Sequence, residues 1–161
     1  MVWSALQPVV NWLGGSALGV WLGQSPTRIA ILFVVHLTGL TLLLGGTIVM
    51  SLGLAGVGFR SGSSAQLARE IGPWRMAGLA LAIISGFLIF TGGALTYFEG
   101  QWFRRKMTLL LIAVIFNFSW FRIVTNAPDG RFGPWARRLT AGASLLLWFG
   151  VGVSGRAIAF F

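Results

Sequence analysis

The sequence predicts an all-α integral membrane protein, a four-helix bundle preceded by a helix at the membrane interface. Of the 161 residues, 56% are hydrophobic and only 9% are charged. The hydrophobic residues occur in runs longer than the 20 or so residues that cross a bilayer, and most charged residues lie between these runs. The length suits one transmembrane domain over residues 1–161.

Four hydrophobic runs are the candidate spans. We expect them at about residues 28–59, 74–98, 106–126 and 137–161. Ser25 and Pro26 are typical of the first residues of a helix, so they predict the start of the first span.

The connection between the first two runs is rich in polar and charged residues. We expect residues 60–72 to form a polar loop, with a short surface helix after Ser63 and Ser64. Proline is tolerated in the first turn of a helix, so we expect Pro73 to open the second span.

The N-terminal segment, residues 2–24, is apolar and carries no charged side chain. Its tryptophans suit a membrane interface, so we expect an interfacial helix. Three glycines spaced four residues apart would share one helix face and allow close packing on another helix: Gly15, Gly19 and Gly23. A loosely ordered glycine-rich arm and a fifth span are the alternatives.

The charge balance is strongly basic, with 12 Lys and Arg against 3 Asp and Glu and a net charge of +9. Because the cations lie near span ends, lipid head groups are their expected partners, and nucleic acid is not. Arg122, near one end of the third span, is expected to snorkel to the surface. The absence of cysteine excludes disulfides and thiolate ligands.

The distribution of basic residues also predicts the orientation. Basic residues are slightly more numerous at the end of the bundle that contains loops 60–72 and 127–138. This end is therefore expected to face the cytoplasm, and both termini the periplasm.

His36 is the one histidine, and it lies within the first hydrophobic run. An ionisable group at such a depth is costly and often marks a function. Imidazole is the usual nitrogen ligand of haem and of metal ions, so His36 is the candidate axial or metal ligand. The alternative is a neutral imidazole that hydrogen-bonds between helices.

Because successive spans run in opposite directions, several polar side chains should meet His36 at one end of the bundle. The candidate cofactor-binding residues are His36, Tyr97, Lys106, Met107 and Arg156. A haem would take its iron ligand from His36, with Met107 or a second chain as the partner. Its propionates would pair with the two cations of the set.

Each candidate also has a structural alternative. Lys106 and Tyr97 suit anchoring at the interface, and Arg156 suits snorkelling. Glu99 belongs to the same end, and Asn117 lies deeper, where it could bond a neighbouring helix.

Several segments of the chain resemble a bacterial family of uncharacterised four-span membrane proteins of about this length. They are HLTGLTLLLGG, PWRMAGLALAIISGFLIFTGG, an F-x-x-K motif and the terminal GRAIAFF. More distantly, the His in the first span and the Lys opening a later one are similar to HemJ-type protoporphyrinogen oxidases and copper-resistance D-type membrane proteins. The resemblance implies a role for His36 and Lys106 and association of the His with haem.

These observations predict a multi-pass protein of the bacterial inner membrane that binds haem b or is redox-associated through His36. A non-catalytic subunit or scaffold of a larger membrane complex is the first alternative, and a small metal-handling or transport protein is the second. A homodimer is compatible with each of them. The pattern leaves open whether the protein is an enzyme, since no catalytic motif of a soluble enzyme class is present.

Overall fold

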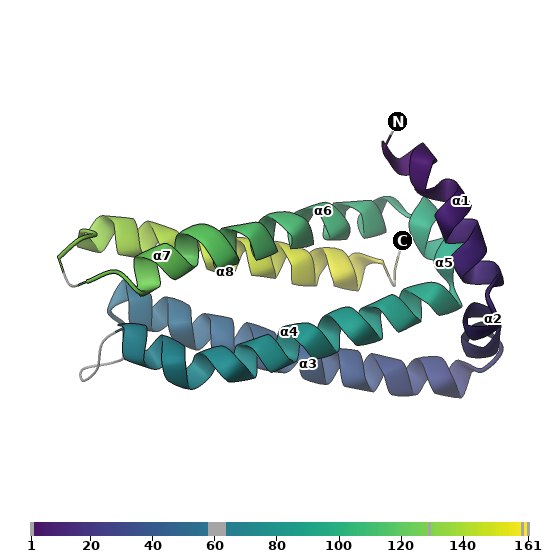
Figure 1. The fold of residues 1–161 in the computed structure, drawn as a ribbon, viewed down its shortest axis with the longest axis horizontal. Coiled ribbons are helices and arrows are strands. Elements are labelled where there is room, and N and C mark those ends of the chain that lie inside the picture. Colours follow the sequence, from purple (N-terminus) through teal and green to yellow (C-terminus); the bar gives the residue numbers. More distant parts are fainter. Residues whose placement is uncertain (1, 58–63, 129, 159, 161) are drawn as a thin grey trace.

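The computed structural model describes residues 2–57, 64–128, 130–158 and 160, and this part of the chain is helical without any strand (Figure 1). The helices are α1 (Val2–Gly15), α2 (Ala17–Gly23), α3 (Pro26–Ala55), α4 (Ser64–Gly92), α5 (Ala94–Glu99), α6 (Gln101–Phe116), the π-helical segment η1 (Asn117–Phe121), α7 (Arg122–Thr125) and α8 (Pro134–Ala157). The all-α prediction is confirmed.

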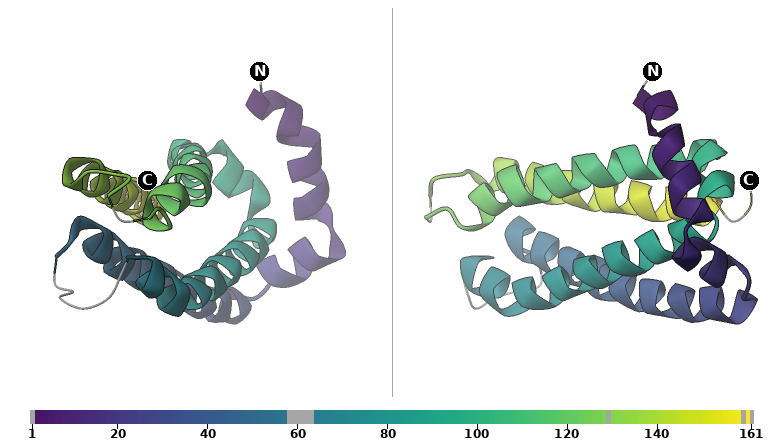
Figure 2. Two further views of the ribbon diagram at one scale, coloured as in Figure 1. Left: turned by 60° about the vertical axis from the view of Figure 1, so that its left-hand side comes forward. Right: turned by 45° about the vertical axis from the view of Figure 1, so that its right-hand side comes forward.

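The long helices form two antiparallel pairs that lie on each other. α3 pairs with α4, and the continuous rod α6–η1–α7 pairs with α8, while α3 also packs on α8 (Figure 1). α4 and α6, by contrast, make no extensive contact. α1 runs across one end of the molecule, beside α5 (Figure 2).

Three of these helices are long and apolar enough to cross a membrane: α3, α4 and the rod over Gln101–Thr125. They indicate a multi-pass membrane protein. α8 has 24 residues but does not satisfy the same hydropathy criterion. The fourth span at 137–161, and with it a four-span bundle, therefore stays a prediction.

Both ends of the first polar connection differ from the prediction. α3 ends at Ala55 and not at residue 59, because Gly56 adopts a left-handed conformation with φ 77° that closes the helix. α4 begins at Ser64 and runs without interruption through Pro73. A proline inside a helix removes the hydrogen bond to the carbonyl four residues earlier, here that of Arg69. Both residues are exposed, so solvent or head groups can satisfy this carbonyl. Residues 60–63 of the expected loop lie outside the described chain.

The second predicted span also ends too late. α4 stops at Gly92, six residues before the predicted end at 98, and the short helix α5 follows after Gly93. α6 then begins at Gln101, five residues earlier than expected. The change of direction places Tyr97 over Gly93, where a Cβ would lie 2.9 Å from the ring, so only glycine fits this corner without displacement.

The N-terminal segment forms two helices and not a loose arm. Ser16 separates them, because its hydroxyl donates to the Leu13 carbonyl at 2.6 Å and accepts from the Gly19 amide at 3.1 Å. The expected close packing holds for Gly19 and Gly23, where a Cβ would lie 3.0 and 2.7 Å from carbonyl oxygens at the end of α4. Gly15 has open space around it. The interfacial position of this segment stays a prediction.

α3 and α4 cross at a pair of glycines. A Cβ on Gly39 would lie 2.7 Å from the Ala82 amide nitrogen, and one on Gly78 would lie 2.6 Å from the Leu43 nitrogen. The two backbones therefore touch directly, as small residues allow in membrane helices. This contact determines which side of α3 faces α4.

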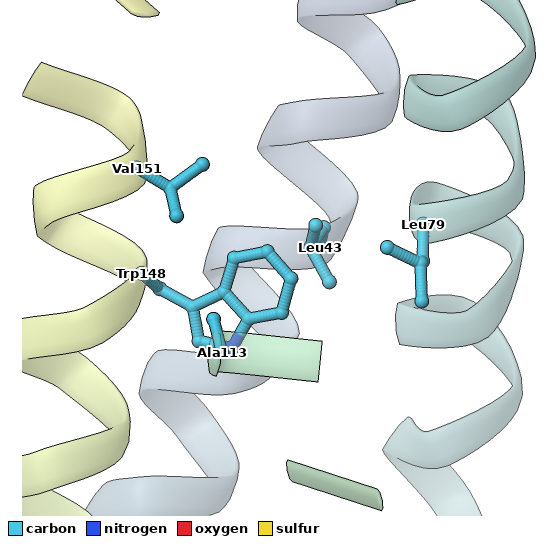
Figure 3. Close-up of a cluster of buried hydrophobic side chains, with 5 residues drawn as sticks. All are labelled: Leu43, Leu79, Ala113, Trp148 and Val151. Carbon is cyan, nitrogen blue, oxygen red and sulfur yellow. The ribbon is translucent and has the colours of Figure 1, made fainter. Parts of the chain in front are cut away.

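A hydrophobic cluster joins both helix pairs near the middle of the bundle. Figure 3 shows the Trp148 indole reaching from α8 toward Leu43 of α3, with Leu79 of α4 beyond and Ala113 of α6 at the edge of the ring. All of these side chains are buried, with exposed fractions of 0 to 7%. Leu43, Leu79 and Trp148 of this cluster also line a cavity next to His36.

Candidate functional site: an apolar cavity with one imidazole and one ammonium

A cavity of about 470 Å³ lies between α4 and α6, whose backbones make few close contacts. Its walls come from α3, α4, α6 and α8, and α1 and α5 cover one end. The lining is almost wholly apolar, and the exceptions are His36 and Lys106. A volume of several hundred cubic ångströms with a few polar groups is typical of a small-molecule site.

His36 is 9% exposed and reaches from α3 to α4. Its Nδ1 lies 3.1 Å from Ser85 Oγ. Ser85 has one hydroxyl hydrogen, and it donates this hydrogen to the Leu81 carbonyl. Ser85 Oγ must therefore accept from His36, so the proton of the neutral imidazole resides on Nδ1.

The other ring nitrogen keeps its lone pair. Nε2 of His36 hydrogen-bonds to no side chain within the described chain, and the ring lines the cavity. A histidine whose Nδ1–H is held by a neighbour and whose Nε2 is unprotonated has the state of a metal ligand.

Gly86 provides the space for the ring. A Cβ built on Gly86 would lie 3.0 Å from Cε1 and 3.3 Å from Nδ1 of His36. Any larger residue would push the imidazole away from Ser85. Residues 85 and 86 of α4 therefore orient the ring together, one by a hydrogen bond and one by the absence of a side chain.

Lys106 and Met107 line the same cavity from α6. The Lys106 side chain lies along α8, where a Cβ on Gly155 would be 3.6 Å from Nζ. No ion pair involves Lys106 among the described residues, and an ammonium beside apolar groups is costly without an anion. The pair His36 and Lys106, predicted to share one end of the bundle, does share a cavity.

The other candidates lie elsewhere. Arg156 is exposed, with its guanidinium 4.5 Å from the centre of the Phe160 ring, and it lines a separate apolar groove between α3 and α8. Tyr97 lies over Gly93, and Glu99 is exposed on α5; neither lines the cavity. Their roles at a cofactor stay predictions.

Asn117 lies in a second polar site, away from the cavity. It is 3% exposed, its Oδ1 accepts from Arg75 Nη1 and from Ser144 Oγ, each at 3.2 Å, and its amide donates to the Ala113 carbonyl. Asn117 thus links its own rod to α4 and α8. This agrees with the expectation that it could bond a neighbouring helix.

Sequence reasoning missed Ser85, Gly86 and Ser144, because each is a small residue in an apolar run and carries no local motif. Among the described residues, no three His, Cys, Asp or Glu side chains lie together as a metal site would need.

The fold and the cavity define a class: an all-helical, multi-pass membrane protein with an apolar cavity lined by one imidazole and one ammonium. The chain belongs to DUF6644, a family of unknown function, which matches residues 9–161. No curated protein matches the chain, and no solved structure does. The resemblance to HemJ-type oxidases and copper-resistance D-type proteins stays an expectation.

Proposed function

We propose that this chain is a haem-binding protein of the bacterial inner membrane, a four-helix bundle that uses His36 as an axial ligand of haem b. The observation that carries the proposal is the state of His36. Its Nδ1–H is held by Ser85, and its Nε2 remains available beside an apolar cavity. A resident haem would supply electron-transfer chemistry.

The lining of the cavity suits the two faces of a porphyrin. Leu40, Phe87, Phe90 and Leu110 offer apolar and aromatic surface, which favours a flat hydrophobic ring. Haem also carries two carboxylates, and Lys106 in the same cavity can pair with one of them. Haem would therefore offer iron to the imidazole, a carboxylate to the ammonium and a hydrophobic ring to the apolar lining.

The second axial position has fewer candidates. Met107 lines the same cavity and is the one thioether that does so. Without it, the iron would be five-coordinate or would take a ligand from a second copy of the chain. The spectrum of the bound haem distinguishes these cases, because a six-coordinate ferrous haem has sharp α and β bands.

The direct test is an absorption spectrum of the detergent-purified protein, oxidised and then reduced, after expression with ample haem precursor. We expect a Soret band whose position shifts on reduction. His36→Ala should abolish it while the protein stays inserted, since Ala is favourable in a helix. Lys106→Ala should weaken haem retention without abolishing the band.

The matched control is Arg156→Ala. It removes a cation near the same end of the bundle, but this cation lines a different groove, so the Soret band should be retained. Wild-type protein without any Soret band under these conditions would contradict haem binding. The first alternative, a non-catalytic subunit of a membrane complex with a structural His36, would then predict co-purifying subunits.

A further inference from the structure

A second pocket, of about 370 Å³, lies at the opposite end of the bundle from His36. It is bounded by α4 on one side and by η1 and α7 on the other. Three arginines line it, Arg69 and Arg75 from α4 and Arg122 from α7, and no carboxylate of the described residues does. We propose that this pocket binds a phosphate group, either the head group of an anionic phospholipid or a free phosphate.

Arg75 is the deepest of the three cations. It lies eleven residues after the start of α4, or about 16 Å along the axis, and it is half-buried. Its Nη1 donates to Asn117 Oδ1 at 3.2 Å, and its guanidinium lies 5.6 Å from the centre of the Phe121 ring. A guanidinium has five N–H donors, and the remaining four have no acceptor among the described residues.

Asn117 holds Arg75 in place. Both of its amide atoms are engaged, through Ser144, Arg75 and the Ala113 carbonyl, so its own position is determined from three sides. The π-helical turn begins at this residue, and such turns occur frequently at functional sites. The deep cation is therefore preorganised, which lowers the cost of binding an anion.

Arg69 and Arg122 lie nearer the end of the bundle, and both are exposed. Neither side chain makes a hydrogen bond or ion pair with the described chain. The nearby acid Glu70 is instead bonded to Gln66 at 3.1 Å and does not line the pocket. Within the described part of the chain, these two cations at the rim and the one below them have no anionic partner.

The remaining lining suits a lipid. Met50, Met76 and Phe118 add apolar surface next to the arginines, so the pocket offers cations for a head group and hydrocarbon for an acyl chain. Basic pockets between membrane helices are known to bind anionic head groups. Planar guanidinium groups match two phosphate oxygens at once.

The test measures thermal unfolding of the purified full-length protein in a neutral detergent. It compares added phosphatidylglycerol, phosphatidylcholine and inorganic phosphate, the last against sodium chloride at equal ionic strength. We expect phosphatidylglycerol to stabilise the protein at concentrations where phosphatidylcholine does not. Stabilisation by phosphatidylglycerol alone assigns the site to a lipid, and stabilisation by inorganic phosphate as well assigns it to a free phosphate.

The variant R69Q/R122Q should raise the apparent Kd by tenfold or more, because charge-assisted hydrogen bonds to phosphate are lost. R138Q/R131Q is the matched control. It removes two exposed arginines from the same end that do not line the pocket, and its Kd should stay within about twofold of the wild type. Equal losses in both double variants, or no anion effect in the wild type, would overturn the proposal.

Discussion

Nδ1 of His36 lies 3.1 Å from Oγ of Ser85, although 49 positions separate the two residues. The bond joins α3 to α4 and holds Nδ1 against α4, while the ring lines the cavity. The donor and acceptor roles follow from the second bond of Ser85 to the Leu81 carbonyl. A serine in an apolar helix thus decides which nitrogen of the single histidine carries the proton.

This relationship makes Ser85→Ala an informative variant. Without the acceptor on Oγ, the Nδ1–H loses its partner and the ring is free to rotate. We expect the apparent haem affinity to fall by about 10- to 100-fold, as is usual when the partner of a ligating histidine is removed. The measurement is a haem titration followed by the Soret band.

Thr91→Ala is the control for the serine variant. Thr91 is a buried hydroxyl residue on the same helix, and it donates to the Phe87 carbonyl. It does not contact His36, so its haem affinity should match that of the wild type. A Ser85→Ala variant with wild-type affinity would show that the imidazole is oriented by packing against Gly86 alone.

Gly39→Ala should destabilise the fold, because the added methyl would lie 2.7 Å from the backbone of α4. Backbone atoms cannot move aside as a side chain can, so the helices must separate. The expected loss is about 1–3 kcal/mol of unfolding free energy. Thermal or denaturant unfolding in detergent measures it.

Gly45→Ala, on the same helix, is the counterpart to this change. Gly45 has nothing within 4 Å of the position of a Cβ, so alanine should be neutral or stabilising by up to about 1 kcal/mol. If both variants lost stability alike, the loss at Gly39 could not be attributed to the α3–α4 contact.

Asn117→Ala should cost about 1–3 kcal/mol, since it leaves the buried Ser144 hydroxyl and one Arg75 donor without their acceptor. Asn126→Ala is a suitable comparison. Asn126 is exposed and bonds only the Arg122 carbonyl through its side chain, so its loss should be below about 0.5 kcal/mol. Unfolding midpoints of both variants check the difference.

The orientation in the membrane can be tested with reporter fusions after Ser61 and after Phe161. The excess of arginine near the first site predicts cytoplasmic reporter activity there and periplasmic activity at the C-terminus. An even number of spans requires both termini on one side. Cytoplasmic activity at the C-terminus would reverse the orientation or reduce the number of spans to three.

Much of the helical architecture could be predicted from the sequence. Runs of apolar residues indicate membrane helices because the bilayer demands length and hydrogen-bonded backbone. The ends of the helices were less predictable. Pro73 was expected to open a helix and lies inside one, and Gly56 ended α3 earlier than hydropathy indicated. Hydropathy does not report the backbone conformation of a single residue, which decides where a helix ends.

The sequence alone also determined how far along its helix each polar residue lies. A rise of 1.5 Å per residue and alternating directions place His36 and Lys106 at one end, Arg75 and Arg122 toward the other, and Asn117 deeper in the bundle. The same reasoning placed Arg156 at the end that contains His36, yet this side chain faces a different groove.

Only the tertiary structure decided the rotation of each helix about its axis. A helix in a bilayer is apolar all round, so hydrophobicity does not say which face is buried. Here the direct contact of Gly39 with Gly78 sets the rotation of α3 against α4 and brings His36 to Ser85. The cavity exists because α4 and α6 stay apart, and such a gap between two helices is a property of packing that no single segment of the chain contains.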